Sequence, residues 1–173
     1  LYVSERYNCL VRAVNMSTTE VSTFAGDYVL GFVDGPVARF NHPLGIAADA
    51  GGNLFVCDKD NFALRKITPT GWTSTVAGTG ATGAADGEGT SASMTQPYAV
   101  DIDLDGGLLY VLTNDFSTAG ASVRQVDLAT GLVSTLGGGS EVANTATGAI
   151  GMCLGADKGV FFFASDYAQA LHA

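Results

Sequence analysis

The sequence predicts an all-β fold in which units of four antiparallel strands repeat along the chain. Two observations lead to this prediction: short apolar runs recur at a nearly constant interval, and turn sequences rich in glycine and aspartate separate them. No stretch keeps the 3.6-residue apolar period of a helix over several turns. The 23 glycines among 173 residues agree with a chain that makes many tight turns.

The most regular series consists of the apolar runs LYV, LFV, LYV and FFF. These runs end at Val3, Val56, Val111 and Phe163, so the intervals are 53, 55 and 52 residues. We label them strand B of each unit. A period of this length is expected of a repeat protein in which each unit is one supersecondary structure.

Three further series keep the same order around strand B. Strand A precedes it, and strands C and D follow, with an arginine at the same place in each strand C (Arg12, Arg65 and Arg124). The segments are 44–50, 98–104 and 150–156 for A, 10–14, 63–67 and 122–126 for C, and 21–26, 73–78 and 133–138 for D.

Turn sequences join these runs. DAGGN, DLDGG and DKG stand between A and B, and TPTG (68–71) and DLATG (127–131) stand between C and D. Each run is about five residues long, as strands usually are. Four antiparallel strands that repeat at this period are typical of the blade of a β-propeller.

Long links join strand D to the next strand A, over residues 34–43 and 78–96. We expect each link to carry the chain from the outer edge of one blade to the inner strand of the next. Phe40 and Met94 are then expected to fill the gap between blades, while Pro43 and Pro97 begin strand A, where a missing N–H costs little.

The strand-C arginines, Arg12, Arg65 and Arg124, recur once per blade. We interpret them as repeated structural contacts with a neighbouring turn or blade, and a ring of ligand-binding arginines is the alternative. Between strands B and C stand Asp58, Asp60 and Asn61, with Glu5 and Asn8 one unit earlier. These side chains are expected to accept backbone N–H bonds in their turns.

The segments DGPVARFNHPLGIAADAGGNLFVCDKDNFALRKI and VAGTGATGAADGEGTSASMTQPYAVDIDLDGGLLYV resemble successive members of the NHL-repeat family. The resemblance is strong for residues 34–87. It weakens downstream, where the third unit has GGGSEVANTATGA in place of the link and the fourth has His172 in place of the arginine. It implies a propeller, and propellers of this family close with roughly six blades.

The strand count is fourteen, or three and a half blades, in a single partial propeller with boundaries near 1–33, 34–87, 88–139 and 140–173. So few blades cannot close a ring. The alternatives are a piece of a larger propeller, an open arc completed by another chain, or a partly sequenced protein, and we favour the piece. The expected partners are a protein or further copies or blades that complete the propeller.

Composition excludes several classes of function. The net charge is −9 with eight Lys and Arg together, so no basic stripe is available for nucleic acid or for an anionic membrane surface. No apolar run approaches the roughly 20 residues that span a bilayer, so we expect no membrane insertion of this segment.

Two motifs suggest ligands only weakly. Asp101, Asp103 and Asp105 begin like a calcium loop, but Leu112 stands where a bidentate Glu is needed. We favour a solvated strand face over calcium, and we expect no other cofactor. Residues 78–83 match GxGxxG, yet no apolar helical face follows, so we expect a linking loop there.

The three cysteines, Cys9, Cys57 and Cys153, match no zinc spacing. We expect buried, small apolar side chains, and a Cys9–Cys57 disulfide stays open. Catalysis is not expected, since His42 and His172 are the only histidines and no Ser/His/Asp or Cys/His set forms at matching positions.

Asn15-Met16-Ser17 is an N-glycosylation sequon in a turn between strands C and D. With few lysines and many Ser and Thr residues, it favours an extracellular or cell-surface protein. The sequence thus predicts a non-catalytic NHL-type module for protein binding or structural assembly. The alternatives are a fragment of a propeller enzyme (a lyase or hydrolase) with its site in the central channel, and a sensor domain of a membrane receptor.

Overall fold

The computed structural model describes residues 1–103, 105–115, 120–138, 149–154 and 161–165. Its regular elements are strands, apart from two 3-10 turns of three residues each. Among these residues no helix is long and apolar enough to cross a membrane. In chain order the elements are β1 (Tyr2–Glu5), β2 (Leu10–Val14), β3 (Val21–Ala25), β4 (Pro43–Ala48), β5 (Leu54–Asp58), η1 (Lys59–Asn61), β6 (Ala63–Ile67), β7 (Thr73–Ala77), β8 (Gly87–Glu88), η2 (Gly89–Ser91), β9 (Gln96–Ile102), β10 (Leu108–Asp115), β11 (Gly120–Asp127), β12 (Leu132–Gly138), β13 (Ala149–Leu154) and β14 (Phe161–Ser165).

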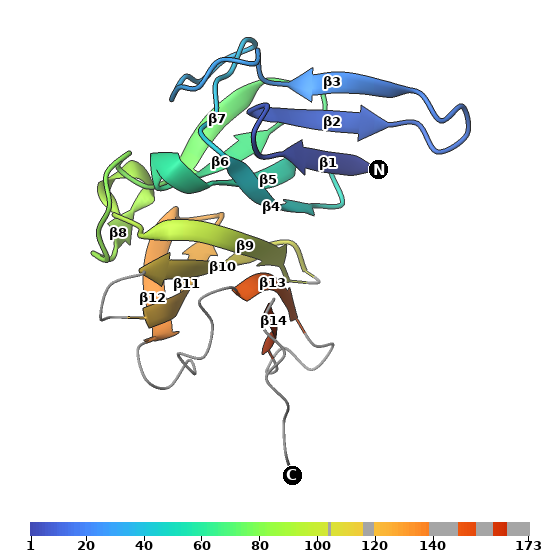
Figure 1. Ribbon diagram of the computed structural model, residues 1–173. Helices are drawn as coiled ribbons and strands as arrows, with labels where there is room; N and C mark the ends of the chain where they lie inside the picture. Colours follow the sequence, from blue (N-terminus) through green and yellow to red (C-terminus); the bar gives the residue numbers. More distant parts are fainter. Residues whose placement is uncertain (104, 116–119, 139–148, 155–160, 166–173) are drawn as a thin grey trace.

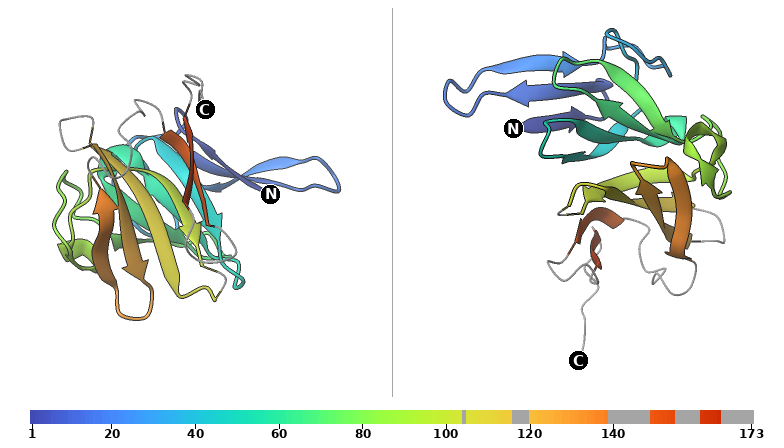
Figure 2. Two further views of the ribbon diagram at one scale, coloured as in Figure 1. Left: turned by 90° about the horizontal axis from the view of Figure 1, so that it is seen from below. Right: turned by 180° about the vertical axis from the view of Figure 1, so that it is seen from behind.

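The strands form four antiparallel sheets, which we call blades 1 to 4 (Figure 1). Blade 1 has the order β1-β2-β3, blade 2 has β4-β5-β6-β7, blade 3 has β9-β10-β11-β12 with β8 added beside β12, and blade 4 has β13-β14. The sheets form an open arc, which two further views confirm (Figure 2). The predicted all-β fold and the four-stranded antiparallel blade are therefore confirmed.

The pairing register repeats from blade to blade. Each strand-C arginine lies opposite the valine that ends the strand-B run: Val3 opposite Arg12, Val56 opposite Arg65, and Val111 opposite Arg124. An irregularity in the pairing with strand D falls directly before each of these arginines. A bulge re-aims the side chain beside it, so the same local geometry directs all three arginines to the same side of their blades.

Two apolar clusters join consecutive blades. Phe40 lies fully buried between blades 1 and 2, and Met94 lies fully buried between blades 2 and 3. Around Phe40 pack Cys9, Val11 and Ala25 from the blade 1 side and Leu54, Val56 and Ile67 from blade 2. The predicted interblade position of both side chains is confirmed. Burial of such large apolar groups is the main term that holds neighbouring blades together.

The links follow a path that the sequence indicated only in part. We call residues 26–42 link 1 and residues 78–95 link 2. Gly35 of link 1 pairs with Thr73 of β7, and β8 of link 2 pairs with β12. Each link thus lies along the outer strand of the blade that it enters before it reaches that blade's inner strand. The short strand β8 was not expected from the sequence.

The last unit is described only through β13 and β14. The third strand predicted for this unit, together with His172, lies outside the described residues. The strand starts also shift slightly: strand A begins at Pro43 in blade 2 and at Gln96 in blade 3, so Pro97 is the second residue of β9.

The inner strands β4 and β9 approach each other closely at Gly45. A Cβ atom at this position would lie 2.6 Å from the Cα atom of Ala99 and 2.7 Å from the carbonyl oxygen of Tyr98. Both are backbone atoms, which cannot move aside independently of the strand.

We therefore expect Gly45→Ala to lower the free energy of unfolding by about 1–3 kcal/mol, as overpacking does. The measurement is urea unfolding followed by circular dichroism. Gly107→Ala is the matched control because its Cβ would meet no atom within 4 Å. Equal stability of the two variants would show that the strands can separate without cost.

Candidate functional site

The polar sites of the structure gather where a link crosses strand C. Arg65 of β6 and Arg124 of β11 are almost completely buried, and both guanidinium groups point to the link of their own blade. We call the Arg65 site clamp 2 and the Arg124 site clamp 3, after their blades. Buried arginine is rare unless it is paired, so each clamp requires a set of acceptors.

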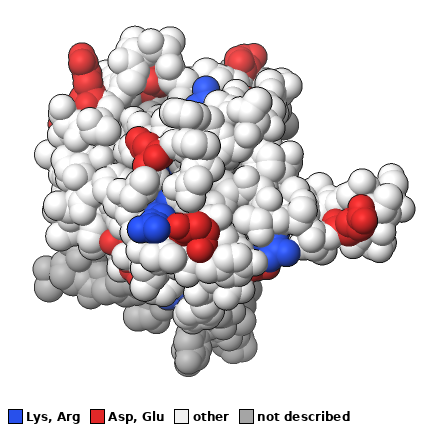
Figure 3. All heavy atoms as spheres, turned by 90° about the horizontal axis from the view of Figure 1, so that it is seen from above, with Lys and Arg blue, Asp and Glu red and all other residues white. Residues whose placement is uncertain are grey.

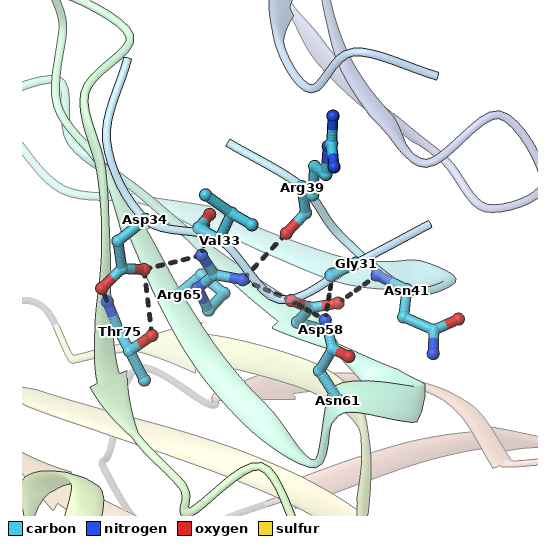
Figure 4. A network of polar contacts seen from close by, with 9 residues as sticks. All are labelled: Gly31, Val33, Asp34, Arg39, Asn41, Asp58, Asn61, Arg65 and Thr75. Atoms are coloured by element: carbon cyan, nitrogen blue, oxygen red, sulfur yellow. Dashed lines mark hydrogen bonds and ion pairs between the residues drawn. The ribbon is translucent and has the colours of Figure 1, made fainter. Parts of the chain in front are cut away.

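In clamp 2 the guanidinium group of Arg65 donates to four acceptors (Figure 4). Nη2 donates to the Val33 carbonyl oxygen at 2.8 Å and to Asp34 Oδ1 at 2.7 Å. Nη1 donates to Asp58 Oδ2 at 2.6 Å and to the Arg39 carbonyl oxygen at 3.2 Å. Charge-assisted bonds of this kind are among the stronger ones in proteins, so Arg65 fixes the middle of link 1.

Both aspartates of clamp 2 also bind elsewhere. Asp34 Oδ1 accepts from Thr75 Oγ1 at 3.0 Å, and its Oδ2 accepts from the Thr75 N–H at 3.1 Å. Asp58 is fully buried and accepts from the Asn41 N–H at 2.7 Å and from Asn61 Nδ2 at 2.9 Å. Burial raises the pKa of Asp58, and these bonds and the ion pair with Arg65 oppose the rise.

Aromatic rings complete clamp 2. The guanidinium carbon of Arg65 lies 4.9 Å from the ring centre of Phe32 and 5.3 Å from that of Phe40. Such contacts add attraction to a desolvated cation. Link 1 therefore contributes an anion, two carbonyl oxygens and two rings to one arginine.

Clamp 3 repeats this plan with fewer partners. Arg124 donates to the carbonyl oxygens of Ser93 at 3.0 Å and Ala85 at 3.1 Å, and to Asp86 Oδ1 at 2.9 Å. Thr135 Oγ1 donates to the same Asp86 oxygen at 2.8 Å. Burial alone would raise the pKa of Asp86, but the bonds from Thr135 and the Arg124 guanidinium hold it below its usual value.

Arg12 of β2 occupies the matching position in blade 1 and is bound differently. Its side chain is 20% exposed, against 0% for Arg65 and 1% for Arg124. It lies 3.8 Å from Glu5 Oε1, and its Nε donates to the Ser22 carbonyl oxygen at 3.2 Å. Within the described part of the chain, no link contributes an aspartate to Arg12. The three arginines thus form two filled structural clamps and one partly exposed site, and the described contacts favour structural contacts over a ligand-binding ring.

A second polar cluster, which sequence reasoning missed, lies between the inner ends of blades 2 and 3. The Asp60 carboxylate contacts His42 Nδ1 at 2.6 Å, Lys59 Nζ at 2.7 Å and Gln96 Nε2 at 2.7 Å. Burial alone would raise the pKa of Asp60, but the contacts with Lys59 and His42 keep it low. His42 and Gln96 each precede the proline of a strand A, and an alignment of the two links would have revealed this matched pair.

The polar residues of the B-to-C turns thus bind differently from the prediction. The Asp58 carboxylate accepts a hydrogen bond from the backbone N–H of Asn41 in link 1. The described partners of the Asp60 carboxylate are side chains. Asn8 donates to Glu5 Oε2 at 2.9 Å instead of accepting a turn N–H in the described contacts. Asp58 and Asp60 thus connect segments that lie far apart in the chain, whereas the Asn8–Glu5 bond is local.

The calcium candidates do not converge on one site. Asp103 Oδ1 accepts from the N–H groups of Gly107 at 2.8 Å and of Leu108, the first residue of β10, at 3.0 Å. Asp101 Oδ1 accepts from the Ile102 N–H. Across the described ranges, which include Asp105, no group of three or more His, Cys, Asp and Glu side chains is placed to hold a metal ion.

Asn15 lies at the exposed end of the β2–β3 hairpin. Its Oδ1 accepts from the N–H groups of Ser17 and Thr18 at 2.9 and 3.2 Å, which closes a local turn. The hairpin projects from the body of the molecule (Figure 1). A glycan at Asn15 would therefore meet no packed neighbour.

The remaining candidates are structural. Cys9 and Cys57 are both buried free thiols, so the structure contains no disulfide between them, and burial raises the pKa of Cys57. The side chain of Cys153 lies outside the described residues. The GxGxxG segment at 78–83 begins link 2, and the only helical turn after it within that link is η2, of three residues.

The comparisons with known proteins agree with this geometry. The family model of the NHL repeat matches residues 40–67, which run from the end of link 1 through β6. The matched segment thus contains Phe40, which fills the gap between blades 1 and 2 and which we call the interblade plug, together with Asp58 and Arg65 of clamp 2.

Two curated relatives cover most of the chain. NHL repeat-containing protein 2 of Homo sapiens is 30% identical over 148 residues, which are 79% of this chain and 20% of that protein. Protein SUPPRESSOR OF QUENCHING 1, chloroplastic, of Arabidopsis thaliana is 28% identical over 138 residues, which are 73% of this chain and 13% of that protein. The chain spans about a fifth or less of the length of these relatives.

A chain in the crystal structure of the nidogen/laminin complex has a similar fold. Its TM-score is 0.64 with 14% sequence identity, and the match covers 95% of this chain and 51% of that one. The likeness is one of fold.

Removing the cation of clamp 2 is expected to lower the stability of the fold strongly. We expect Arg65→Met to lower the free energy of unfolding by about 3–5 kcal/mol, because Asp58 would stay buried without its counter-ion. The matched Arg12→Met should cost less than about 1 kcal/mol, since a partly exposed ion pair contributes little. Thermal unfolding measures both, and similar losses would contradict the assigned difference between the sites.

Proposed function

Since the chain belongs to the NHL-repeat family and its blades form part of a β-propeller, we propose that it is a non-catalytic module for protein binding or structural assembly. The observation that carries the proposal is a group of exposed apolar side chains on link 1, which we call the link 1 patch. It consists of Tyr28, Val29, Leu30, Phe32, Val33 and Val37. A contiguous patch of exposed apolar side chains often marks a protein–protein interaction site.

The three charged side chains of link 1 are all paired: Asp27 with Arg39, and Asp34 with Arg65. Seen from the blade 1 side, Lys, Arg, Asp and Glu form isolated spots and no broad field of one sign (Figure 3). Interface centres are depleted in charge and enriched in aromatic residues, and Tyr28 and Phe32 supply the aromatic groups. A protein surface is therefore the partner that this composition fits best.

The clamps support a rigid scaffold beneath the patch. Phe32 and Val33 belong to link 1, which Arg65 holds through the Val33 carbonyl oxygen and through the ring of Phe32. Binding to a surface whose backbone is already fixed loses less conformational entropy. The nidogen/laminin structure, a complex of proteins, gives a precedent for protein contact by a chain of similar fold.

The non-catalytic part of the proposal rests on how the acid–base groups are engaged. His42, the histidine within the described residues, binds Asp60 through Nδ1, and the ring of Tyr7 lies 5.9 Å from it at its edge. Asp60 is shared further by Lys59 and Gln96. The His42 side chain is 28% exposed, but the described bonds of Asp60 join blade 2 to blade 3 through Gln96.

The patch should decide partner capture. The chain is immobilised and exposed to an extract of the source organism, and bound proteins are cross-linked. We expect the unaltered chain to capture a protein that the triple variant Tyr28→Ser, Leu30→Ser, Val37→Ser does not capture. The control is Leu132→Ser, Leu136→Ser, which alters two exposed apolar residues on β12. Two outcomes would contradict a binding role for the link 1 patch: equal capture by both variants, or no capture by the unaltered chain.

An extracellular or cell-surface location is the further part of the proposal, and the exposed sequon at Asn15 supports it. Expressed through a eukaryotic secretory pathway, the chain should carry an added mass of sugar size. Asn15→Gln should remove that mass, and Asn8→Gln should leave it unchanged because Asn8 lies in no sequon. Intact mass spectrometry measures the difference, and an unmodified wild-type chain would contradict the prediction.

A further inference from the structure

Link 1 and link 2 share one backbone plan, so each link is an internal control for the other. The strand-C arginine donates to two carbonyl groups of its link, those of Val33 and Arg39 in clamp 2 and those of Ala85 and Ser93 in clamp 3. In both links the N–H of the later residue also donates to the carbonyl oxygen of the earlier one, at 3.1 Å. Arg39 and Ser93 therefore occupy matching positions, and so do Val33 and Ala85.

The side chains at matching positions of the two links differ in size. Three exposed positions are large and apolar in link 1 and small in link 2: Leu30, Phe32 and Val33 match Thr82, Ala84 and Ala85. Both links nevertheless fill a clamp and place a large apolar side chain between blades. The fold therefore does not require large apolar groups at these positions, which favours a binding role for them in link 1.

The position of Arg39 differs in charge as well as in size. In link 2, Ser93 Oγ accepts from the Ala85 N–H at 2.9 Å. In link 1, Arg39 instead reaches Asp27, where its Nε donates to Oδ2 at 2.8 Å. Its stem lies against Gly31, since a Cβ atom added there would be 3.0 Å from both Cβ and Cδ of Arg39. Link 1 thus holds the stem of Arg39 and one nitrogen of its guanidinium group.

The other two nitrogens of this guanidinium group face solvent. The Arg39 side chain is 42% exposed, and no described contact engages Nη1 or Nη2. Figure 4 shows this side chain pointing away from clamp 2, while the Arg39 carbonyl oxygen accepts from Arg65. Val33, which pairs with Arg39, is 43% exposed, and Leu30 is 57% exposed. The link 1 patch therefore has a cation beside its exposed apolar side chains.

The opening around Arg39 belongs to the position itself and does not depend on a neighbouring link. Blade 3 has link 1 on the blade before it, yet the hydrogen bonds described for Ser93 come from Ala85 of link 2 and from Arg124 of the same blade. A preceding link supplies none of the described hydrogen bonds at this position.

A protein that covers the link 1 patch also removes water from the Nη groups of Arg39. A purely apolar surface would leave these donors without acceptors, and an unpaired buried charge opposes binding strongly. A cationic surface would bring like charges together. A carboxylate offers two oxygen atoms that accept two parallel N–H bonds from one arginine. A carboxylate is therefore the group that best completes this surface.

We propose that the link 1 patch binds a protein segment in which one Asp or Glu side chain is flanked by apolar residues, and that Arg39 selects this carboxylate. Leu30, Phe32 and Val33 provide the apolar contacts. The net charge of −9 repels a tract of many acidic residues, so the segment carries a single carboxylate among apolar groups. The inference rests on the binding role proposed above and names the chemistry of the partner.

The experiment selects peptides from a random library displayed on phage, with the whole chain immobilised. The selected peptides should share an Asp or Glu between apolar residues and should not bind the triple variant Tyr28→Ser, Leu30→Ser, Val37→Ser. One selected peptide is then synthesised in its acidic form and with the matching Asn or Gln. Fluorescence anisotropy should show about tenfold weaker binding of the amide form, as loss of a charge-assisted bond implies.

Three chain variants test the role of Arg39. Arg39→Ser carries the residue that link 2 has at the matching position, and it should bring the tenfold ratio close to one. Arg39→Gln should do the same, since it keeps an amide donor near Asp27 and removes the charge. Arg6→Ser alters an exposed arginine outside link 1 and is the control that should retain the ratio. Circular dichroism verifies that each variant is folded.

Three results would overturn the inference. These are a selection that yields no peptide dependent on the patch, selected peptides without a shared acidic residue, and a tenfold ratio that persists in folded Arg39→Ser or Arg39→Gln. Partner capture by the unaltered chain and by the triple variant decides the proposed function separately. If that capture depends on the patch while one of these three results is found, only this inference fails and the binding role stands.

Discussion

The buried guanidinium group of Arg65 is the constraint on which the second blade depends. A cation with no exposure destabilises the fold by several kcal/mol unless it is neutralised, and here both Nη atoms are hydrogen-bonded while Nε is not. Asp58 supplies the buried counter-charge, while Asp34 and two carbonyl oxygens come from link 1. The link therefore has to cross strand C where it does, and this path sets where Phe40 enters the gap between blades.

The clamp and the plug act on the same segment in different ways. The clamp is directional and fixes position, whereas Phe40 and Met94 supply non-directional apolar burial. Gly45 then allows the inner strands to approach so closely that no side chain fits between them. Together these features leave little freedom between blades, so recognition is expected on the turns and the exposed link residues.

Much of this architecture follows from the sequence because the repeats expose it. The four series predicted strands and their order, and the positions of Phe40 and Met94 before Pro43 and Pro97 indicated the plug. Periodicity could not indicate that β8 pairs with β12, because a two-residue strand carries no pattern. It also missed the partners of Asp60, because His42 of link 1 and Gln96 of β9 meet it only in the folded chain.

The same reasoning explains the difference among the three arginines. Their local sequences are alike, so sequence reasoning treats them alike, but burial depends on whether a link lies across the residue. A link aspartate reaches Arg65 and Arg124, whereas the described contact of Arg12 with link 1 is a bond of 3.5 Å to the Tyr28 hydroxyl. The burial of each arginine therefore depends on a link aspartate that the local sequence around the arginine does not show.

Amide hydrogen exchange, read by mass spectrometry on the unaltered chain and on Arg65→Met, tests the central role of clamp 2 most directly. The account predicts faster exchange in residues 31–41 of the variant, with protection of β10 and β11 in blade 3 unchanged under the same native conditions. Unchanged exchange in residues 31–41 would contradict it, because link 1 would then hold its path without the arginine.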